Sequence, residues 1–294
     1  MIRFVFLAAC IFSFASDAED SVWHSVRWNG ERALASEVQG WRAIVSLDRG
    51  RLVHFGPAGS ETNLLFAPVT RNERVGWGGH RLWFGPQSTW SNGWPPPVAW
   101  ELSGAESFTV TNGILRVVMP DAGDGWPRLT RIYRWNGKRL VCGAELSGGT
   151  RSAQIVHIVQ VPVQALVCVS PQPGKLAPLG YVQLPSSVMP SFTADFTPPP
   201  HATAYEKGLM LRHLASVQKL GFFPQPLVAR ENTFSLTSTR GEQTGVVVDE
   251  PDQGFFTQVY LGGPEPFIEL EQLSPSFSAG GGASFAIELE GTAH

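Results

Sequence analysis

The sequence predicts an all-β fold, a large sandwich of many antiparallel strands. Apolar and polar residues alternate with a period of two along much of the chain, which is typical of strands with one buried face. Glycine and proline are both abundant, at 31 and 23 residues, and suit tight turns between short strands. Asn112-Gly113 and Asn136-Gly137 each stand between two alternating segments, and this pair favours a two-residue hairpin turn.

The predicted strands follow this alternation from residue 41 onward. Asp48-Arg49-Gly50 and the two Asn-Gly pairs join the first six strands into three hairpins. In chain order the strands cover residues 41–47, 51–56, 108–111, 114–119, 129–135, 138–142, 154–161, 164–169, 219–223, 232–239, 245–248, 255–261, 266–273 and 283–290. A proline-rich segment over 171–201 is expected to be irregular, and 204–218 has a weak helical pattern. Because strands of the same character follow, residues 19–294 are expected to form a single domain.

The first 18 residues have the form of a secretory signal peptide. Arg3 precedes an apolar segment over 4–14 that is too short to span a membrane, and Ser16-Asp17-Ala18 has the small-x-small form of a cleavage site. Leu7-Ala8-Ala9-Cys10 also fits a bacterial lipobox, which makes lipid anchoring at Cys10 a secondary alternative. We therefore expect a periplasmic or extracellular protein with no transmembrane segment in the mature chain.

Several classes of partner are disfavoured by composition and spacing. The net charge is −3 and no basic run occurs, so nucleic acid is not expected as a partner. The seven histidines are scattered without ligand spacing, and no phosphate-binding glycine loop precedes a helix, so neither a metal nor a cofactor is predicted. Cys142 and Cys168 lie in apolar segments and either form a disulfide or remain as two buried thiols.

An aromatic segment over residues 76–97 is the most unusual stretch of the chain. It holds four of the ten tryptophans, and His80-Arg81 follows Gly78-Gly79 directly. This mixture is not expected to form a simple core strand. One interpretation is the wall of a binding cleft, where ring faces meet an apolar ligand face and His80 or Arg81 makes a polar contact. The other is a loop that plugs one end of the sandwich.

Three strands carry side chains that suit chemistry. In the strand over 266–273, Glu269 and Glu271 point to one face, which is either solvent or a polar cleft that raises one pKa. In the strand over 154–161, His157 points away from the two glutamines and is either a core histidine or an acid. Lys219 begins its strand and either reaches into a cleft or extends to solvent.

The aromatic segment resembles the signature of a bacterial family of unknown function related to the galactose mutarotases. That family has Gly-Gly-His-Arg/Lys-Leu-Trp, Pro-Glu/Gln, a spaced Trp and Trp-Pro-Pro-Asp. The matching residues are Gly78-Gly79-His80-Arg81-Leu82-Trp83, Pro86-Gln87, Trp90 and Trp94-Pro95-Pro96, and the match ends at Pro97. Glu269-Leu270-Glu271-Gln272-Leu273-Ser274-Pro275 is similar to the family's C-terminal Glu-x-Glu-x-x-Ser-Pro, and Lys219-Leu220-Gly221 to its Lys-Ile-Gly strand.

The resemblance implies a galactose mutarotase-like β-supersandwich whose concave sheet holds a sugar. In aldose 1-epimerase chemistry, Glu271 or Glu269 would take the proton of the anomeric hydroxyl, and His80 or His157 would protonate the ring oxygen. The mutarotase pattern Asn-x-x-His is replaced by Gln154-Ile155-Val156-His157. The candidate ligand-binding residues are Arg81, Trp83, Gln87, Trp90, Trp94 and Lys219.

Two alternatives to an enzyme stay open on the sequence. The first is a secreted carbohydrate-recognition protein that uses the same contacts without turnover. The second is a cell-envelope interaction domain whose tryptophan-rich patch buries against another protein.

Overall fold

The computed structural model describes residues 22–70, 77–86, 98–174, 180–184, 203–205, 208–213, 215, 218–261, 263 and 265–294. The expected signal peptide and the candidate residues Gln87, Trp90 and Trp94 lie outside these ranges. Across the described ranges, no helix is both long enough and apolar enough to cross a membrane.

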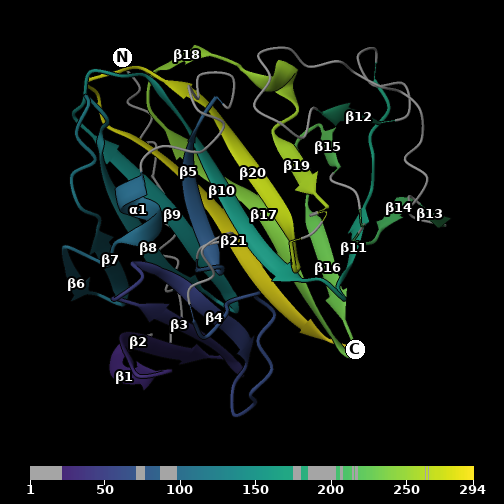
Figure 1. Ribbon diagram of the computed structural model, residues 1–294, viewed down its shortest axis with the longest axis horizontal. Coiled ribbons are helices and arrows are strands. Elements are labelled where there is room, and N and C mark those ends of the chain that lie inside the picture. Colours follow the sequence, from purple (N-terminus) through teal and green to yellow (C-terminus); the bar gives the residue numbers. More distant parts are fainter. Residues whose placement is uncertain are drawn as a thin grey trace, which may run out of the picture.

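The described chain forms three antiparallel sheets (Figure 1). The first contains, in spatial order, β1 (His24–Trp28), β2 (Glu31–Val38), β3 (Trp41–Ser46) and β4 (Arg51–Pro57). The second has seven strands: β12 (Tyr181–Leu184), β15 (Lys219–Phe222), β19 (Thr257–Tyr260), β20 (Phe267–Phe277), β10 (Ala153–Pro162) and β5 (His80–Gly85), with β18 (Val247–Asp249) also paired to β20.

The third sheet has ten strands and lies behind the second in the view of Figure 1. Its strands, in spatial order, are β13 (Thr203–Tyr205), β14 (Gly208–Leu211), β11 (Leu166–Val169), β16 (Leu227–Glu231), β17 (Phe234–Thr244), β21 (Ala283–Ala293), β9 (Arg139–Ser147), β8 (Arg128–Asn136), β7 (Ile114–Val118) and β6 (Ser107–Thr111). Two short helical elements are also described, α1 (Val98–Leu102) and the 3₁₀ turn η2 (Asp252–Gly254).

The main hydrophobic core joins all three sheets. Leu52 of the four-stranded sheet, Leu270 of the seven-stranded sheet and Ile287 of the ten-stranded sheet belong to one continuous cluster of buried side chains. The strands β5, β10, β15 and β20 send alternate side chains into this cluster. The side chains between them point to the opposite face, which we call the open face.

The predicted β-class and all three predicted hairpins are confirmed. β3 pairs with β4, β6 with β7, and β8 with β9, each antiparallel. The chain also forms β1, β2 and β16 where no strand was predicted. β12 lies within the proline-rich segment over 171–201, so the expectation that this segment is irregular was wrong for these residues, because β12 pairs with β15.

Two further expectations about secondary structure were wrong. The weak helical pattern over 204–218 includes β13 and β14 instead, because Leu211 pairs with Val167 of β11 and tertiary pairing outweighs a weak local preference. The aromatic segment contains β5, a buried strand bonded to β10, which the sequence analysis did not expect there.

The two remaining cysteines are free thiols. Cys142 lies in β9 and Cys168 in β11, and these strands are not neighbours in the ten-stranded sheet. Both thiols are buried, so the alternative of two buried thiols holds over that of a disulfide.

Candidate functional site

The open face brings together residues from strands that are distant in sequence. β10 lies between β5 and β20, and Ile158 of β10 pairs with Arg81 on one side and Glu271 on the other. Paired residues project to the same face of a sheet. Arg81 and Trp83 therefore share a face with Glu269 and Glu271. The expectation that these two glutamates point to one face of their strand is confirmed.

The glycine pair before β5 sets the position of this strand. Gly78 and Gly79 both have positive φ, at 69° and 75°. A Cβ on Gly79 would lie 2.3 Å from the carbonyl oxygen of Leu52, so only glycine allows β4 and the start of β5 to approach this closely. The Gly-Gly-His-Arg motif thus fixes which side chains of β5 reach the open face.

Glu271 and Lys219 form an ion pair on the open face. The Lys219 Nζ donates to Glu271 Oε2 at 2.8 Å, and the two residues are only 8% and 3% exposed, respectively. Lys219 thus reaches across β19 into the sheet face, and the alternative of a lysine extended to solvent is wrong.

A small pocket with about 10 Å³ of space for a water-sized group lies over this ion pair, within a hollow that amounts to about 270 Å³ when open solvent is included. It is lined by Trp83, Gln154, Val156, Lys219, Asp252, Gln258, Glu271 and Leu273. Carboxylates, amides, an ammonium and an indole therefore converge on one hollow, which is the mixture of apolar surface and directed polar groups that small-molecule sites use.

Arg81 holds the neighbouring part of the open face together. Its guanidinium lies 3.0 Å from Glu269 Oε1 and 3.2 Å from Glu101 Oε1, and it stacks 4.2 Å from the centre of the Trp83 ring. Trp83 Nε1 also donates to Glu101 Oε2 at 3.2 Å. Glu101 of α1 thereby orients both the arginine and the indole, although the sequence analysis did not name it.

Burial gives these carboxylates different acidities. Burial raises the pKa of Glu269 to about 7, against the attraction of Arg81. Burial also opposes ionisation of Glu101, but the Arg51 and Arg81 guanidiniums hold its pKa at about 2. Two carboxyl groups that share Arg81 therefore differ in protonation near neutral pH.

Three polar atoms on the open face are buried without a hydrogen-bond partner in the described chain. They are Arg81 Nη2, Gln154 Oε1 and Gln160 Oε1. Buried polar atoms are costly to leave unpaired, and such atoms call for a further partner such as a ligand or ordered water. Because the three include a donor and two acceptors, hydroxyl groups would satisfy all of them.

The two candidate histidines lie on the other face of the sheet. His80 and His157 stack with ring centres 5.1 Å apart, and His157 Nε2 lies 3.0 Å from the carbonyl oxygen of Phe285 in the ten-stranded sheet. Both are 0% exposed. The structure thus places them between the sheets, away from the pocket, because period-two alternation turns residues next to Arg81 and Ile158 inward.

Burial lowers the pKa of both histidines, to about 3 for His157 and well below the usual value for His80. They are therefore neutral at physiological pH. Their position corrects the expectation that one of them supplies the acid of the site.

Asp252 and Gln258 were missed because no local signal marks them. Asp252 lies in a Pro-Asp-Gln-Gly turn, and Gln258 in the short strand β19. Both line the pocket only because the fold brings η2 and β19 beside β20. Within the described ranges, no group of three or more metal-ligating side chains occurs.

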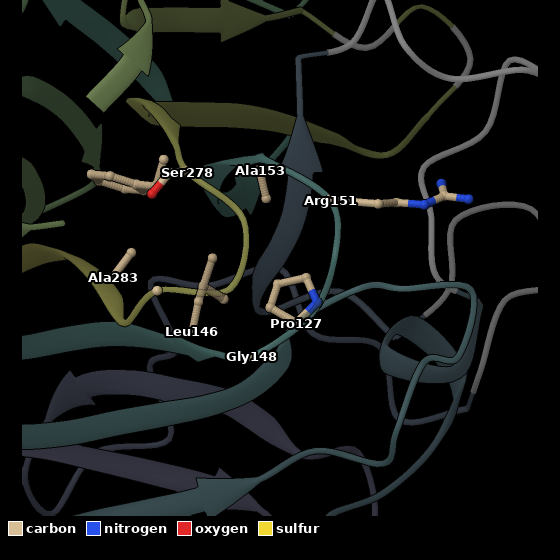
Figure 2. A pocket seen from close by; sticks show the side chains of 9 residues that line it. Pro127, Leu146, Gly148, Arg151, Ala153, Ser278 and Ala283 are labelled. Atoms are coloured by element: carbon tan, nitrogen blue, oxygen red, sulfur yellow. The ribbon is translucent and has the colours of Figure 1, made fainter. Parts of the chain in front are cut away.

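A second hollow lies at the ends of β9 and β20 (Figure 2). Its lining includes Leu146, Ala153 and Ala283, with Arg151 as its charged side chain. The Arg151 side chain extends away from the other labelled residues in Figure 2, and its guanidinium lies 5.0 Å from the Trp126 ring centre. This hollow contains none of the candidate residues.

No family model and no curated protein matches the sequence. Solved structures do match the fold. A galactose mutarotase-like protein from Lactobacillus casei matches with a TM-score of 0.59 at 12% identity, over 88% of this chain and 100% of that one. A galactose mutarotase related enzyme from Lactobacillus acidophilus matches with a TM-score of 0.55 at 7% identity, over 92% and 98%.

A homologue of galactose mutarotase and aldose epimerase from C. elegans also matches, with a TM-score of 0.54 at 9% identity, over 87% of this chain and 96% of that one. These likenesses extend over almost the whole of each chain, so the galactose mutarotase-like fold expected from the sequence is confirmed.

Proposed function

We propose that this protein binds a carbohydrate in the pocket on the open face and exchanges its anomers by acid–base chemistry. The observation that carries the proposal is the convergence of Trp83, Lys219 and Glu271 in one pocket. All three were candidate residues on the sequence, and they come from three separate strands, β5, β15 and β20.

The chemistry of the pocket suits a polyhydroxylated ring. An indole offers apolar surface to the C–H face of a sugar, while carboxylates, amides and an ammonium bond its hydroxyls. The unpartnered atoms of Arg81, Gln154 and Gln160 add a donor and two acceptors on the same face. The likeness in fold to galactose mutarotase-like proteins supports a sugar as the ligand.

Glu271 is the proposed proton acceptor. Its Oε2 is bonded to the Lys219 ammonium, which leaves Oε1 to accept the proton of the anomeric hydroxyl. Departure of that proton opens the ring, the C1 carbonyl turns, and the ring closes on the other face. Glu269, the second candidate, is held by Arg81 and Gln160 and does not line the pocket.

Carbohydrate recognition without turnover is the second candidate function. The observation that favours it is the inward position of His80 and His157. As a result, none of the histidines of the described chain lines the pocket, where one of them was expected to act as the acid. In this case sugar affinity would survive replacement of Glu271, and anomers would not exchange faster than in buffer.

The test is a calorimetric screen of the mature protein against D-galactose, D-glucose and other common aldoses, paired with NMR measurement of anomer exchange. We expect binding with accelerated exchange for at least one sugar, and an affinity reduced about tenfold by Trp83→Ala. Binding without accelerated exchange would favour recognition alone. No binding to any sugar would overturn both functions and favour a protein-binding domain.

We also propose that the chain is exported to the periplasm or beyond, with cleavage after Ala18. The support is the apolar segment and small-x-small site of the first 18 residues. Expression of the full chain in a Gram-negative host, followed by mass spectrometry of the periplasmic fraction, is expected to give an N-terminus at Glu19. A lipid-modified Cys10 would instead support the lipoprotein alternative.

A further inference from the structure

Two carboxyl groups line the pocket from different elements. Glu271 projects from β20, and Asp252 projects from the 3₁₀ turn η2. Both are buried, at 3% and 6% exposure. Paired carboxyl groups in one pocket, with different surroundings, are the arrangement by which proteins assign one acid and one base.

The two groups have different partners. Glu271 has the Lys219 ammonium at 2.8 Å, whereas Asp252 accepts a hydrogen bond from the neutral Gln154 amide at 3.0 Å. Within the described chain, Asp252 forms no ion pair with any lysine or arginine. A buried carboxyl group without a cation partner favours its protonated form, because burial penalises the charge.

Burial has the largest effect on the acidity of Asp252. Burial raises the pKa of Asp252, the charges of Glu271 and Asp249 raise it further, and the Gln154 hydrogen bond and Lys219 only partly oppose this. These groups come from β20, β18, β10 and β15, which surround η2 on the open face.

The backbone at Asp252 is held in an uncommon conformation. Its φ is 60°, in the left-handed region that asparagine and aspartate tolerate best among residues with a Cβ. The Asp252 carbonyl accepts from the Phe255 amide at 2.9 Å, which closes the turn. Strained backbone of this kind is often found where a side chain must be aimed at a ligand.

We propose that Asp252 is the proton donor of this site, which delivers its proton to the ring oxygen of the bound sugar. The inference rests on the proposed function of the pocket. The Gln154 bond ends on Asp252 Oδ2, so the proton resides on Oδ1. Asp252 thereby takes the role that the sequence analysis gave to His80 or His157, both of which lie on the opposite face.

The proton balance closes over one exchange. Glu271 takes the proton from O1, the O1–C1 bond becomes a carbonyl, and the C1–O5 bond breaks with its electron pair on O5. O5 then takes the proton from Asp252. After rotation about C1–C2, O5 attacks the other face of C1, its proton returns to Asp252, and Glu271 returns its proton to O1.

The decisive variant is Asp252→Asn, because asparagine has the same shape and tolerates the positive φ at this position. The measurement is NMR exchange between the anomers of D-galactose and D-glucose, with sugar affinity from calorimetry. We expect the catalysed exchange rate to fall at least about 100-fold, with affinity within about threefold of the wild type. The matched control is Asp124→Asn, an exposed aspartate that also has a positive φ, at 51°, and that is expected to leave both quantities unchanged.

The pH profile provides a second readout that a purely structural role would not change. The wild-type rate is expected to fall as pH rises through the pKa of Asp252, and this fall is expected to vanish in the residual activity of Asp252→Asn. Asp252→Glu is expected to recover part of the rate.

The outcomes separate this inference from the proposed function. A wild type that exchanges anomers, with Asp252→Asn equally active, would overturn the role of Asp252 alone. A wild type with no exchange on any aldose would overturn the proposed catalysis and this role with it. If the variant fails to fold, a wild-type rate that does not fall at high pH overturns the role.

Discussion

The two faces of β5 and β10 differ in their charges and in their access to a pocket, although their residues alternate one by one along the same strands. On the open face, Arg81 and Trp83 adjoin ion pairs and a pocket. On the inner face, His80 and His157 stack on one another within the core. The position of a histidine beside an arginine in sequence therefore does not indicate that the two share a role. One step along a strand moves a side chain from the open face to the core.

The faces also differ in how they manage buried polar groups. The open face pairs Arg81 with two carboxylates and Glu271 with Lys219. The inner face keeps its histidines neutral, since burial lowers their pKa. We expect substitutions on the open face to change binding and exchange, and those on the inner face to change stability alone.

The largest effect is expected from Glu271→Gln, which removes the proposed proton acceptor but keeps its shape. The catalysed anomer exchange rate should fall by about 10²–10⁴, as measured by NMR, while sugar affinity falls by no more than a few-fold. The matched control is Glu242→Gln, an exposed glutamate of β17. An unchanged exchange rate in Glu271→Gln would show that Glu271 is not the proton acceptor, and the open face would then have no catalytic role that the inner face lacks.

The next effect is expected from Arg81→Leu, which leaves Glu101 and Glu269 buried beside an apolar side chain. Breaking a buried ion pair by removing one partner costs about 3–5 kcal/mol, so the free energy of unfolding in urea should fall by about that amount. Arg116→Leu breaks an exposed pair with Glu145 and should cost no more than about 1 kcal/mol. Equal losses in the two variants would contradict the role of Arg81 as the centre of the open face.

The smallest effect at neutral pH is expected from His157→Gln on the inner face, and this effect grows as pH falls. Because burial lowers the pKa of His157 to about 3 in the folded protein, only the unfolded chain takes up this proton as pH falls below the usual 6.5. The titration of His157 therefore leaves the free energy of unfolding unchanged above pH 6.5 and lowers it progressively between about pH 6.5 and 3. Replacement by glutamine should make the fall in unfolding free energy below pH 6 shallower by about 1.4 kcal/mol per pH unit.

Urea denaturation at several pH values measures this slope, and sugar affinity at pH 7 should stay within twofold of the wild type. Glu269 acts in the opposite direction, because burial raises its pKa to about 7 and the folded protein takes up its proton first. Glu269→Gln should therefore make the same slope steeper. A loss of sugar affinity in His157→Gln would show that the inner face contributes to the site.

The sequence by itself determined the β-class, the three hairpins and the position of Glu269 and Glu271 on one face of their strand. Each of these follows from local pattern, since alternation and Asn-Gly turns act over a few residues. The Gly-Gly-His-Arg motif also led to Arg81 and Trp83 of the open face, although no strand was expected there. It did not tell that its histidine points inward, because the side that β5 presents to the core depends on its register with β10.

Only the tertiary structure decided which side chains of the candidate site contact one another. Lys219 meets Glu271 across 52 positions of sequence, and Gln154 meets Asp252 across 98. No periodicity specifies such contacts, because they arise from the order of strands in the sheet and not from the chain around each residue. The sequence determined which side chains share a face of a strand, and the packing of the sheets determined which face became the core.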